Sequence, residues 1–148
     1  MNNTVKINEN LGDFVVDIEA RPGIYAFHPQ SASGKTLLYK KIREANDIPG
    51  IIAFSYDDKA IGYDLSDLLC KRGIPRILVI DRYDLMNGEY IDDIIKVSKN
   101  GVVLVDTKIG IKGINRTGNT VKYIPMVYRD GKLEVVEYDV YLRRRTRC

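Results

Sequence analysis

One segment near the amino terminus limits the fold of this chain more than any other. An apolar run, Ile24 to Phe27, leads into a loop of small and polar residues that ends with Gly34, Lys35 and Thr36. A run with the apolar spacing of an amphipathic helix follows at once. The segment therefore predicts a strand, a tight loop and a helix in direct succession, with the first backbone N–H groups of the helix facing the loop.

The loop has the composition of a phosphate-binding loop. It follows the pattern GxxxxGK[ST], except that Pro29 occupies the first glycine position. Proline has no N–H, so we expect the phosphate donors to be the backbone N–H groups from Ser31 onward, with Lys35 reaching the outer phosphates and the Thr36 hydroxyl holding Mg²⁺. The predicted binding segment consists of Pro29, Gln30, Ser31, Ala32, Ser33, Gly34, Lys35, Thr36 and Leu37. A bare Gly-Lys-Thr can also simply begin a helix after a turn, so a second element has to support the assignment.

That second element is an apolar run that ends in a carboxylate. Residues 77–80 are all apolar, and Asp81 follows them. A continuous apolar run predicts a strand buried on both faces. Because open α/β sheets bind ligands outside the carboxyl ends of their strands, Asp81 is expected beside the loop, where it would hold Mg²⁺ together with Thr36.

Short apolar runs alternate with amphipathic runs through the middle of the chain. Strands are predicted over residues 24–27, 51–55, 77–81 and 102–105, and helices over about 35–46, 64–73 and 90–99. This order predicts an α/β protein, a three-layer sandwich with a mostly parallel central sheet. Residues 5–20 fit either strands or a short helix. Apolar stretches on both sides of residues 129–132 predict a C-terminal β-hairpin.

The length and composition suit one globular domain. The chain has 148 residues, 29% of them charged. We divide it into a core of about residues 23–106, a loop over 107–120, C-terminal strands over 121–142 and a basic tail over 143–148. No apolar run is long enough to span a membrane and no signal-type segment begins the chain, so we expect a cytoplasmic protein that does not enter membranes. Cys70 and Cys148 lack the spacing of a zinc site or a disulfide framework, which predicts free thiols.

In the order of these parts, the chain resembles the RecA-like P-loop ATPases, which include the strand-exchange recombinases and the hexameric replicative helicases. The likeness covers about residues 23–143 and rests on the loop 29–36, on residues 52–57 and on residues 123–130. It implies ATP and Mg²⁺ as ligands, with Lys35, Asp57 and Asp81 in catalytic roles.

The resemblance carries further implications for hydrolysis and for partners. Asp57 stands where the family usually has a glutamate that orients the attacking water, and Asp58 could take its place. Asp106 and Thr107 fall where the family has a polar residue that senses the outermost phosphate. The loop 107–120 falls where the family contacts nucleic acid, and together with the basic tail it predicts a single-stranded DNA partner. A solvated basic terminus is the alternative interpretation of the tail. Many of these enzymes take an arginine from a neighbouring subunit, so a homo-oligomer is also expected, with Arg82, Arg116 and the tail arginines as candidates.

Two functions remain open at this point. The first is Mg-dependent binding of a nucleoside triphosphate with slow hydrolysis, coupled to DNA. The second is a nucleotide-binding module that no longer hydrolyses and docks to a partner protein or nucleic acid, which Pro29 and the short carboxylate Asp57 favour. A small-molecule kinase is less well supported, because no arginine-rich lid is recognisable in the sequence.

Overall fold

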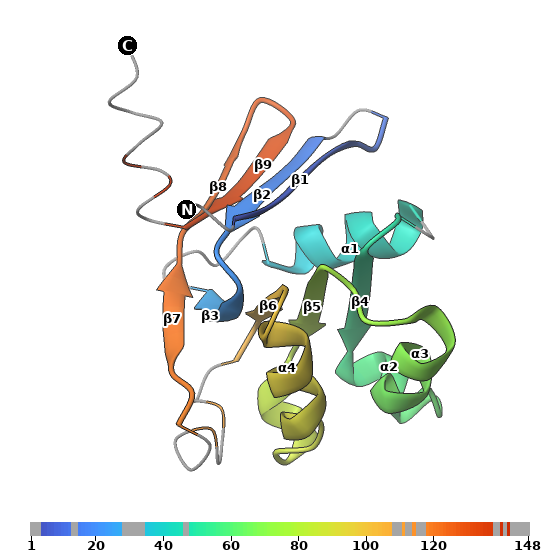
Figure 1. Ribbon diagram of the computed structural model, residues 1–148. Helices are drawn as coiled ribbons and strands as arrows, with labels where there is room; N and C mark the ends of the chain where they lie inside the picture. The colour runs from blue at the N-terminus through green and yellow to red at the C-terminus, as the bar shows by residue number, and fades with distance from the viewer. Residues whose placement is uncertain are drawn as a thin grey trace.

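Two β-sheets form the framework of the described part of the protein (Figure 1). A computed structural model describes residues 4–12, 15–27, 35–45, 48–107, 111, 114, 118–137, 140 and 142, and at residues 35, 36 and 45 it describes the backbone alone. The larger sheet of this part is parallel throughout, and its strands lie in the order β4 (Ile51–Ser55), β5 (Ile77–Asp81), β6 (Val102–Val105), β3 (Gly23–Phe27) and β7 (Val121–Ile124). The smaller sheet is mixed, in the order β1 (Val5–Asn10), β2 (Val15–Ala20), β9 (Lys132–Val136) and β8 (Met126–Arg129).

The parallel sheet is covered on both faces. Along each strand, alternate side chains point to opposite faces, so Tyr25 and Val79 join one apolar cluster while Ile24 and Leu78 join the other. Every residue of β4, β5 and β6 is buried. The continuous apolar runs of the sequence therefore form central strands, as predicted.

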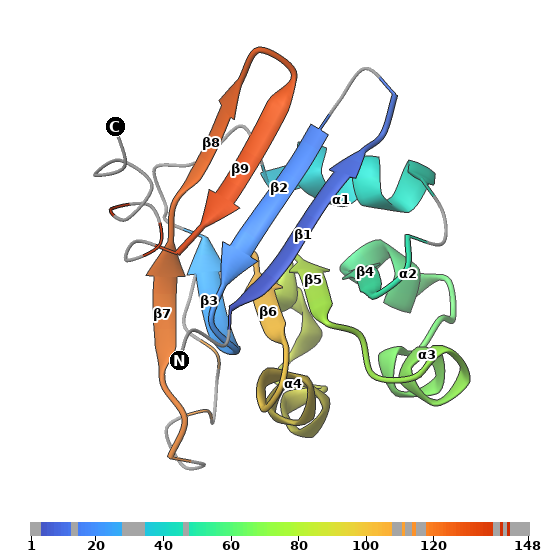
Figure 2. The same cartoon turned by 45° about the horizontal axis from the view of Figure 1, so that its top comes forward.

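Helices and the mixed sheet divide these two faces between them. Helix α1 (Lys35–Ala45) and the mixed sheet pack on one face, through residues that include Leu38, Ile18 and Val135. Helices α3 (Leu65–Arg72) and α4 (Ile91–Ser98) pack on the other face. Figure 2 shows the mixed sheet and α4 on opposite sides of the parallel strands. The fold is thus α/β with a parallel sheet flanked by helices, and the mixed sheet forms part of one flanking layer.

The strand order follows from the connections. The chain crosses from β3 through α1 to β4 at the far edge of the sheet, and then returns through β5 to β6. Crossover connections between parallel strands are almost always right-handed. The connection from β3 to β4 and the connections from β4 back to β6 run in opposite directions across the sheet, so their helices lie on opposite faces. This accounts for α1 lying apart from α3 and α4.

Several segments differ from the sequence-based expectations or resolve them. Residues 5–20, which were left open between strand and helix, form the antiparallel pair β1 and β2. The predicted hairpin exists as β8 and β9, and its turn residues Asp130 and Gly131 both have positive φ, 54° and 73°, as a two-residue type I′ turn requires. Strand β9 ends at Val136, short of the predicted Leu142, whose backbone is helical. Cys70 is exposed with a free thiol, as predicted.

Two short elements were not anticipated. Helix α2 (Tyr56–Ala60) begins directly after β4, where the sequence suggested only the end of a strand. A 3₁₀ helix, η1 (Tyr83–Met86), follows β5. Among the helices in the described ranges, none combines the length and the apolar character needed to cross a membrane.

Candidate functional site

The carboxyl ends of β5 and β6 bring two aspartates together. Ile80 pairs with Val105 in the parallel register, so Asp81 and Asp106 follow in neighbouring positions, and the Asp106 N–H donates to the Ile80 carbonyl at 2.8 Å. Asp81 is only 7% exposed. Burial, together with a hydrogen bond to Asp106 and the negative charge of Asp106, raises the pKa of Asp81 to about 6, although Arg82 acts in the opposite direction. Two adjacent carboxylates of this kind can share a proton or be neutralised by a cation.

Arg82 joins this pair to Asp57. Its Nη2 donates to Oδ2 of Asp57, and its Nε lies 3.5 Å from Oδ2 of Asp81. The backbone of Arg82 is left-handed, with φ 53° and ψ 49°, a conformation that costs a non-glycine residue about 1–2 kcal/mol. The side chain of Asp57 is 74% exposed. The structure thus gathers Asp57 and Asp81, which the sequence proposed as catalytic, at one edge of the sheet, with an arginine between them.

Asp58 has a structural role and is not free to replace Asp57. Its carboxylate accepts hydrogen bonds from the Tyr39 hydroxyl at 2.6 Å, from Arg43 Nη2 at 2.7 Å and from the Ser55 N–H at 2.9 Å. The Ser55 hydroxyl in turn accepts from the Asp58 N–H, which completes a capping box at the start of α2. Burial and the hydrogen bond to Asp58 raise the pKa of Tyr39. With these donors in place, Asp58 has little capacity left to orient a water molecule, contrary to the alternative drawn from the sequence.

A sequence signal for this capping box did exist. Ser55 followed three residues later by Asp58 matches the pattern [ST]-x-x-[DE] that marks the start of a helix. The apolar run of residues 51–54 just before it also fits a strand that ends here, so the same residues match two patterns.

The predicted phosphate loop is described only in part. Helix α1 begins at Lys35, as predicted, and the backbone at Lys35 and Thr36 is helical. The side chain of Leu37 is partly buried against the apolar cluster beneath α1. Pro29, Gln30, Ser31, Ala32, Ser33 and Gly34 lie outside the described residues.

The strand order nevertheless fixes where this loop starts. Ala26 pairs with Val105, and Val105 pairs with Ile80. The last residue of β3, Phe27, is therefore level with Asp106 and Asp81 at the same edge of the sheet. Strands β3 and β5 are two interstrand spacings apart, which is about 10 Å.

This edge also contains the point at which the topology switches. The chain leaves β3 toward the face covered by α1, whereas after β6 it packs Ile111 and Ile114 into the cluster on the opposite face. Adjacent strands whose outgoing connections diverge in this way open the crevice in which α/β proteins bind ligands. Asp106 is the first residue of the connection that leaves β6.

The same edge offers a limited set of metal ligands. Among the described residues, no group of three or more His, Cys, Asp or Glu side chains could hold a metal ion. Asp81 and Asp106 could supply two oxygen ligands, which suits Mg²⁺, since this ion usually takes its remaining ligands from water and phosphate. The Thr36 side chain, the other predicted metal ligand, lies outside the description.

The predicted DNA-contacting segments are described only sparsely. Within the loop 107–120, the structure describes residues 107, 111, 114 and 118–120, and two of these, Ile111 and Ile114, are buried. Arg116 and the tail 143–148 lie outside the described part of the chain.

Fold and site together define an α/β protein with a parallel sheet and an acidic edge at its switch point. A scan of protein-family models, a search of curated proteins and a search of solved structures each find no match to this chain.

Proposed function

We propose that this protein binds ATP, or another nucleoside triphosphate, with Mg²⁺ at the carboxyl edge of its parallel sheet. The observation that carries the proposal is the register of Phe27, Asp106 and Asp81 at that edge. From Phe27 the chain runs through a segment with the Gly-Lys-Thr sequence of a phosphate loop and begins α1 at Lys35. A helix start and two carboxylates at one switch point form a suitable site for a metal-bound polyphosphate.

In this proposal each group has a physical role. Backbone N–H groups of residues 31–34 and the ammonium of Lys35 would bind the phosphate oxygens. The Thr36 hydroxyl and Asp81 would hold Mg²⁺ between them. A divalent cation would also remove the repulsion between Asp81 and Asp106, so metal binding and folding stability should be coupled at this edge.

Hydrolysis, if it occurs, should be slow. Asp57 is the candidate for orienting water, but its carboxylate is paired with Arg82, and Asp58 is occupied by its hydrogen bonds at the start of α2. Water alignment would require Arg82 to release Asp57 and turn toward the phosphates, where its charge would support transfer. This ion pair favours the second candidate function, a nucleotide-binding module that does not hydrolyse.

A thermal melt with and without Mg·ATP tests binding. At a ligand concentration about 100 times Kd, binding stabilises the native state by about 2.7 kcal/mol, which is about 5–10 °C in Tm for a domain of this size. Lys35→Ala should lose the shift. Lys40→Ala, which removes an exposed lysine from the same helix, should retain it. An equal shift in both variants, or no shift in the natural protein, would refute the proposal.

ATP turnover separates the two candidate functions. Steady-state ATPase activity, measured with and without single-stranded DNA, should be absent in Lys35→Ala if this site hydrolyses ATP. Asp57→Asn should then lower turnover while keeping the Mg·ATP-dependent rise in Tm. Binding without turnover in the natural protein under both conditions would establish the non-hydrolysing module.

A further inference from the structure

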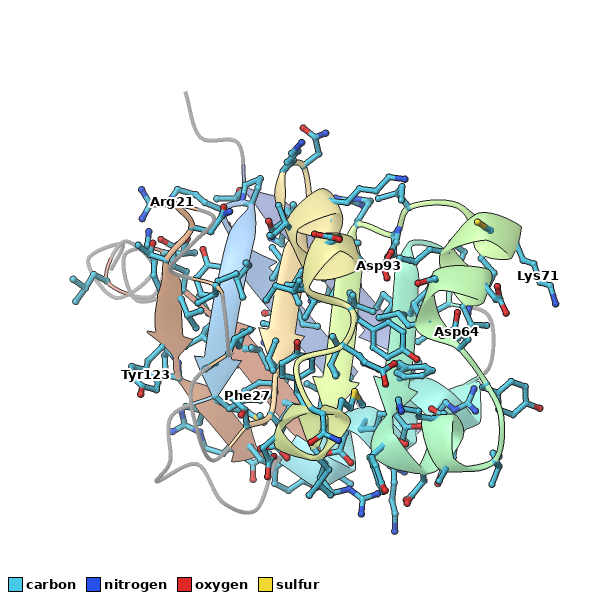
Figure 3. The ribbon with its side chains drawn as sticks, turned by 90° about the horizontal axis from the view of Figure 1, so that it is seen from below. Arg21, Phe27, Asp64, Lys71, Asp93 and Tyr123 are labelled. Atoms are coloured by element: carbon cyan, nitrogen blue, oxygen red, sulfur yellow. The ribbon has the colours of Figure 1, made fainter. Side chains whose placement is uncertain are left out.

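A pocket lies at the opposite end of β3 from Asp81. It has a volume of about 290 Å³ and is lined by the first residues of β3, the end of α4 and the segment that leads into β7. Figure 3 labels Arg21 and Phe27, which mark the two ends of β3, and the pocket lies at the Arg21 end. It is therefore separated from the proposed nucleotide site by the length of the strand.

Two lysines give this pocket a positive charge. Lys99, at the end of α4, and Lys122, in β7, both line it and are exposed. Neither ammonium forms an ion pair or hydrogen bond with any residue that the structure describes. The described lining contains no carboxylate. Two cationic groups that face a common space without an acidic partner make a site for an anion.

Uncharged polar groups add possible hydrogen bonds. Thr120 lines the pocket, and its hydroxyl has no hydrogen-bond partner in the described part of the chain. Before it, Gly118 has a φ of +77° and turns the backbone at the pocket wall. The backbone N–H groups of such a turn can contribute to anion binding.

The end of α4 does not oppose this assignment. A helix C-terminus disfavours anions because its last carbonyls are unpaired. Here the Val97 carbonyl accepts from the Gly101 N–H at 2.8 Å, and the Ile95 carbonyl accepts from the Ser98 hydroxyl at 2.8 Å. Two of the last carbonyls of α4 are thus paired, and each of the two lysines adds a full positive charge against the partial negative charge of the helix end.

We propose that this pocket binds the phosphate group of a small phosphorylated metabolite. Two ammonium groups match the charge of a phosphate monoester dianion better than that of a monocarboxylate. The volume of about 290 Å³ lies just below the usual range for small-molecule sites, about 300–1,000 Å³, so we expect a ligand no larger than a sugar phosphate. The site is independent of the proposed nucleotide site.

Amide chemical shifts of the full-length protein test the location. On titration with ribose 5-phosphate, against potassium chloride at matched ionic strength, the amides of Gly23, Gly118 and Thr120 should shift saturably. The same titration of Lys35→Ala should give the same result, because the nucleotide site is not involved. Shifts that are absent, that chloride reproduces, or that Lys35→Ala abolishes would overturn the proposal.

Matched lysine variants test the recognition. The double variant Lys99→Gln and Lys122→Gln should weaken ribose 5-phosphate binding by about tenfold or more, since two charge-assisted contacts are lost. Lys71→Gln, on the far side of the molecule in Figure 3, should leave binding unchanged. Mg·ATP should still raise the Tm of the double variant, so failure of either site is recognisable separately. Equal affinity in the double variant, or binding of a 5′-phosphorylated oligonucleotide without binding of the sugar phosphate, would refute a small-metabolite site.

Discussion

The hydroxyl of Tyr39 donates a 2.6 Å hydrogen bond to Oδ2 of Asp58 and so joins α1 to the first turn of α2. The same carboxylate accepts from Arg43 and from the Ser55 N–H, and Asp58 is only 6% exposed. Asp58 thus connects the helix that follows the proposed phosphate loop to the end of β4. Asp58 therefore adds a polar connection to the apolar contacts, such as those of Leu38, that hold α1 on the sheet.

Replacing Asp58 with alanine should destabilise the protein strongly. The substitution leaves buried donors without an acceptor and removes the cap of α2, for a loss of about 2–4 kcal/mol in the free energy of unfolding. The neighbouring variant Asp57→Ala is the matched control, because an exposed ion pair contributes only about 0–1 kcal/mol. Urea unfolding of both variants measures the difference, and similar losses would contradict a capping role for Asp58.

Asp81→Asn should stabilise the protein at alkaline pH when no metal is present. The folded-state pKa of Asp81 is about 6, above the ordinary 3.8, owing to burial first and then to Asp106. A carboxyl whose pKa is raised by folding contributes stability below its unfolded pKa and loses that contribution as pH rises through about 6. The variant should therefore exceed the natural protein in Tm at pH 8, by an amount that shrinks toward zero by pH 4.

The same variant should fail to respond to Mg·ATP. Thermal melts in EDTA across pH 4–8 test the first effect, and melts with Mg·ATP at pH 8 test the second. Asp106→Asn is the companion variant and should also raise the Tm at pH 8, because it removes the other charge of the pair. A Tm difference that does not vary with pH would show that folding does not raise the pKa of Asp81.

The sequence predicted the central sheet well because its strands are buried on both faces. Strand β5 and its neighbours read as unbroken apolar runs, which no amphipathic helix of that length would produce. Residues 5–20 were harder to assign. Strand β1 alternates, with Val5 and Ile7 buried and Lys6 and Asn8 exposed, whereas β2 has a run of three buried residues. Because the two strands follow each other closely, the apolar residues of the whole segment 5–20 repeat neither with the period of a strand nor with that of a helix.

The candidate site was predicted in outline only. The position of Asp81 at the end of a strand can be predicted from residues 77–81 alone. Its pairing with Asp106 depends on β6 lying between β5 and β3, and the link to Asp57 depends on the left-handed backbone of Arg82. Strand order and an unusual φ arise from tertiary packing, so no local pattern could have indicated them. Helix α2 was missed because five residues are too few for a helical period.

Gly101→Ala should destabilise the protein through backbone contacts alone. A Cβ at this position would lie 2.6 Å from the carbonyl oxygen of Arg76 and 3.1 Å from those of Pro75 and Val97. Backbone carbonyls cannot move aside as a flexible side chain can, and we expect a loss of about 1–3 kcal/mol. Gly62→Ala is the comparison, since its Cβ would meet open space and only its φ of +103° resists the change. Urea unfolding should show the larger loss for Gly101→Ala, and the reverse order would refute the steric account.

The last prediction concerns Glu137, which joins the end of β9 to the start of β3. Its carboxylate accepts from the Arg21 N–H and Arg21 Nε, both at 2.8 Å, and from the Tyr25 hydroxyl at 3.2 Å. Burial opposes ionisation of this group, but the hydrogen bonds and charge of Arg21, with the help of Tyr25, hold the pKa of Glu137 below its usual value of 4.5. A carboxyl whose pKa is lowered by folding contributes stability above its unfolded pKa and loses it as pH falls through the folded value.

Glu137→Gln should therefore be less stable than the natural protein at pH 7, and the difference should shrink below about pH 4. Since the side chain of Arg21 is 48% exposed, solvent weakens the ion pair, and we expect a loss of about 1–3 kcal/mol at pH 7, most of it from hydrogen bonds to a buried carboxylate. Urea unfolding at pH 7 and at pH 3.5 measures both values. Glu44→Gln, which changes an exposed glutamate on α1, should have little effect at either pH. If the free energy of unfolding lost in Glu137→Gln is as large at pH 3.5 as at pH 7, the negative charge of Glu137 does not stabilise the contact between β9 and β3.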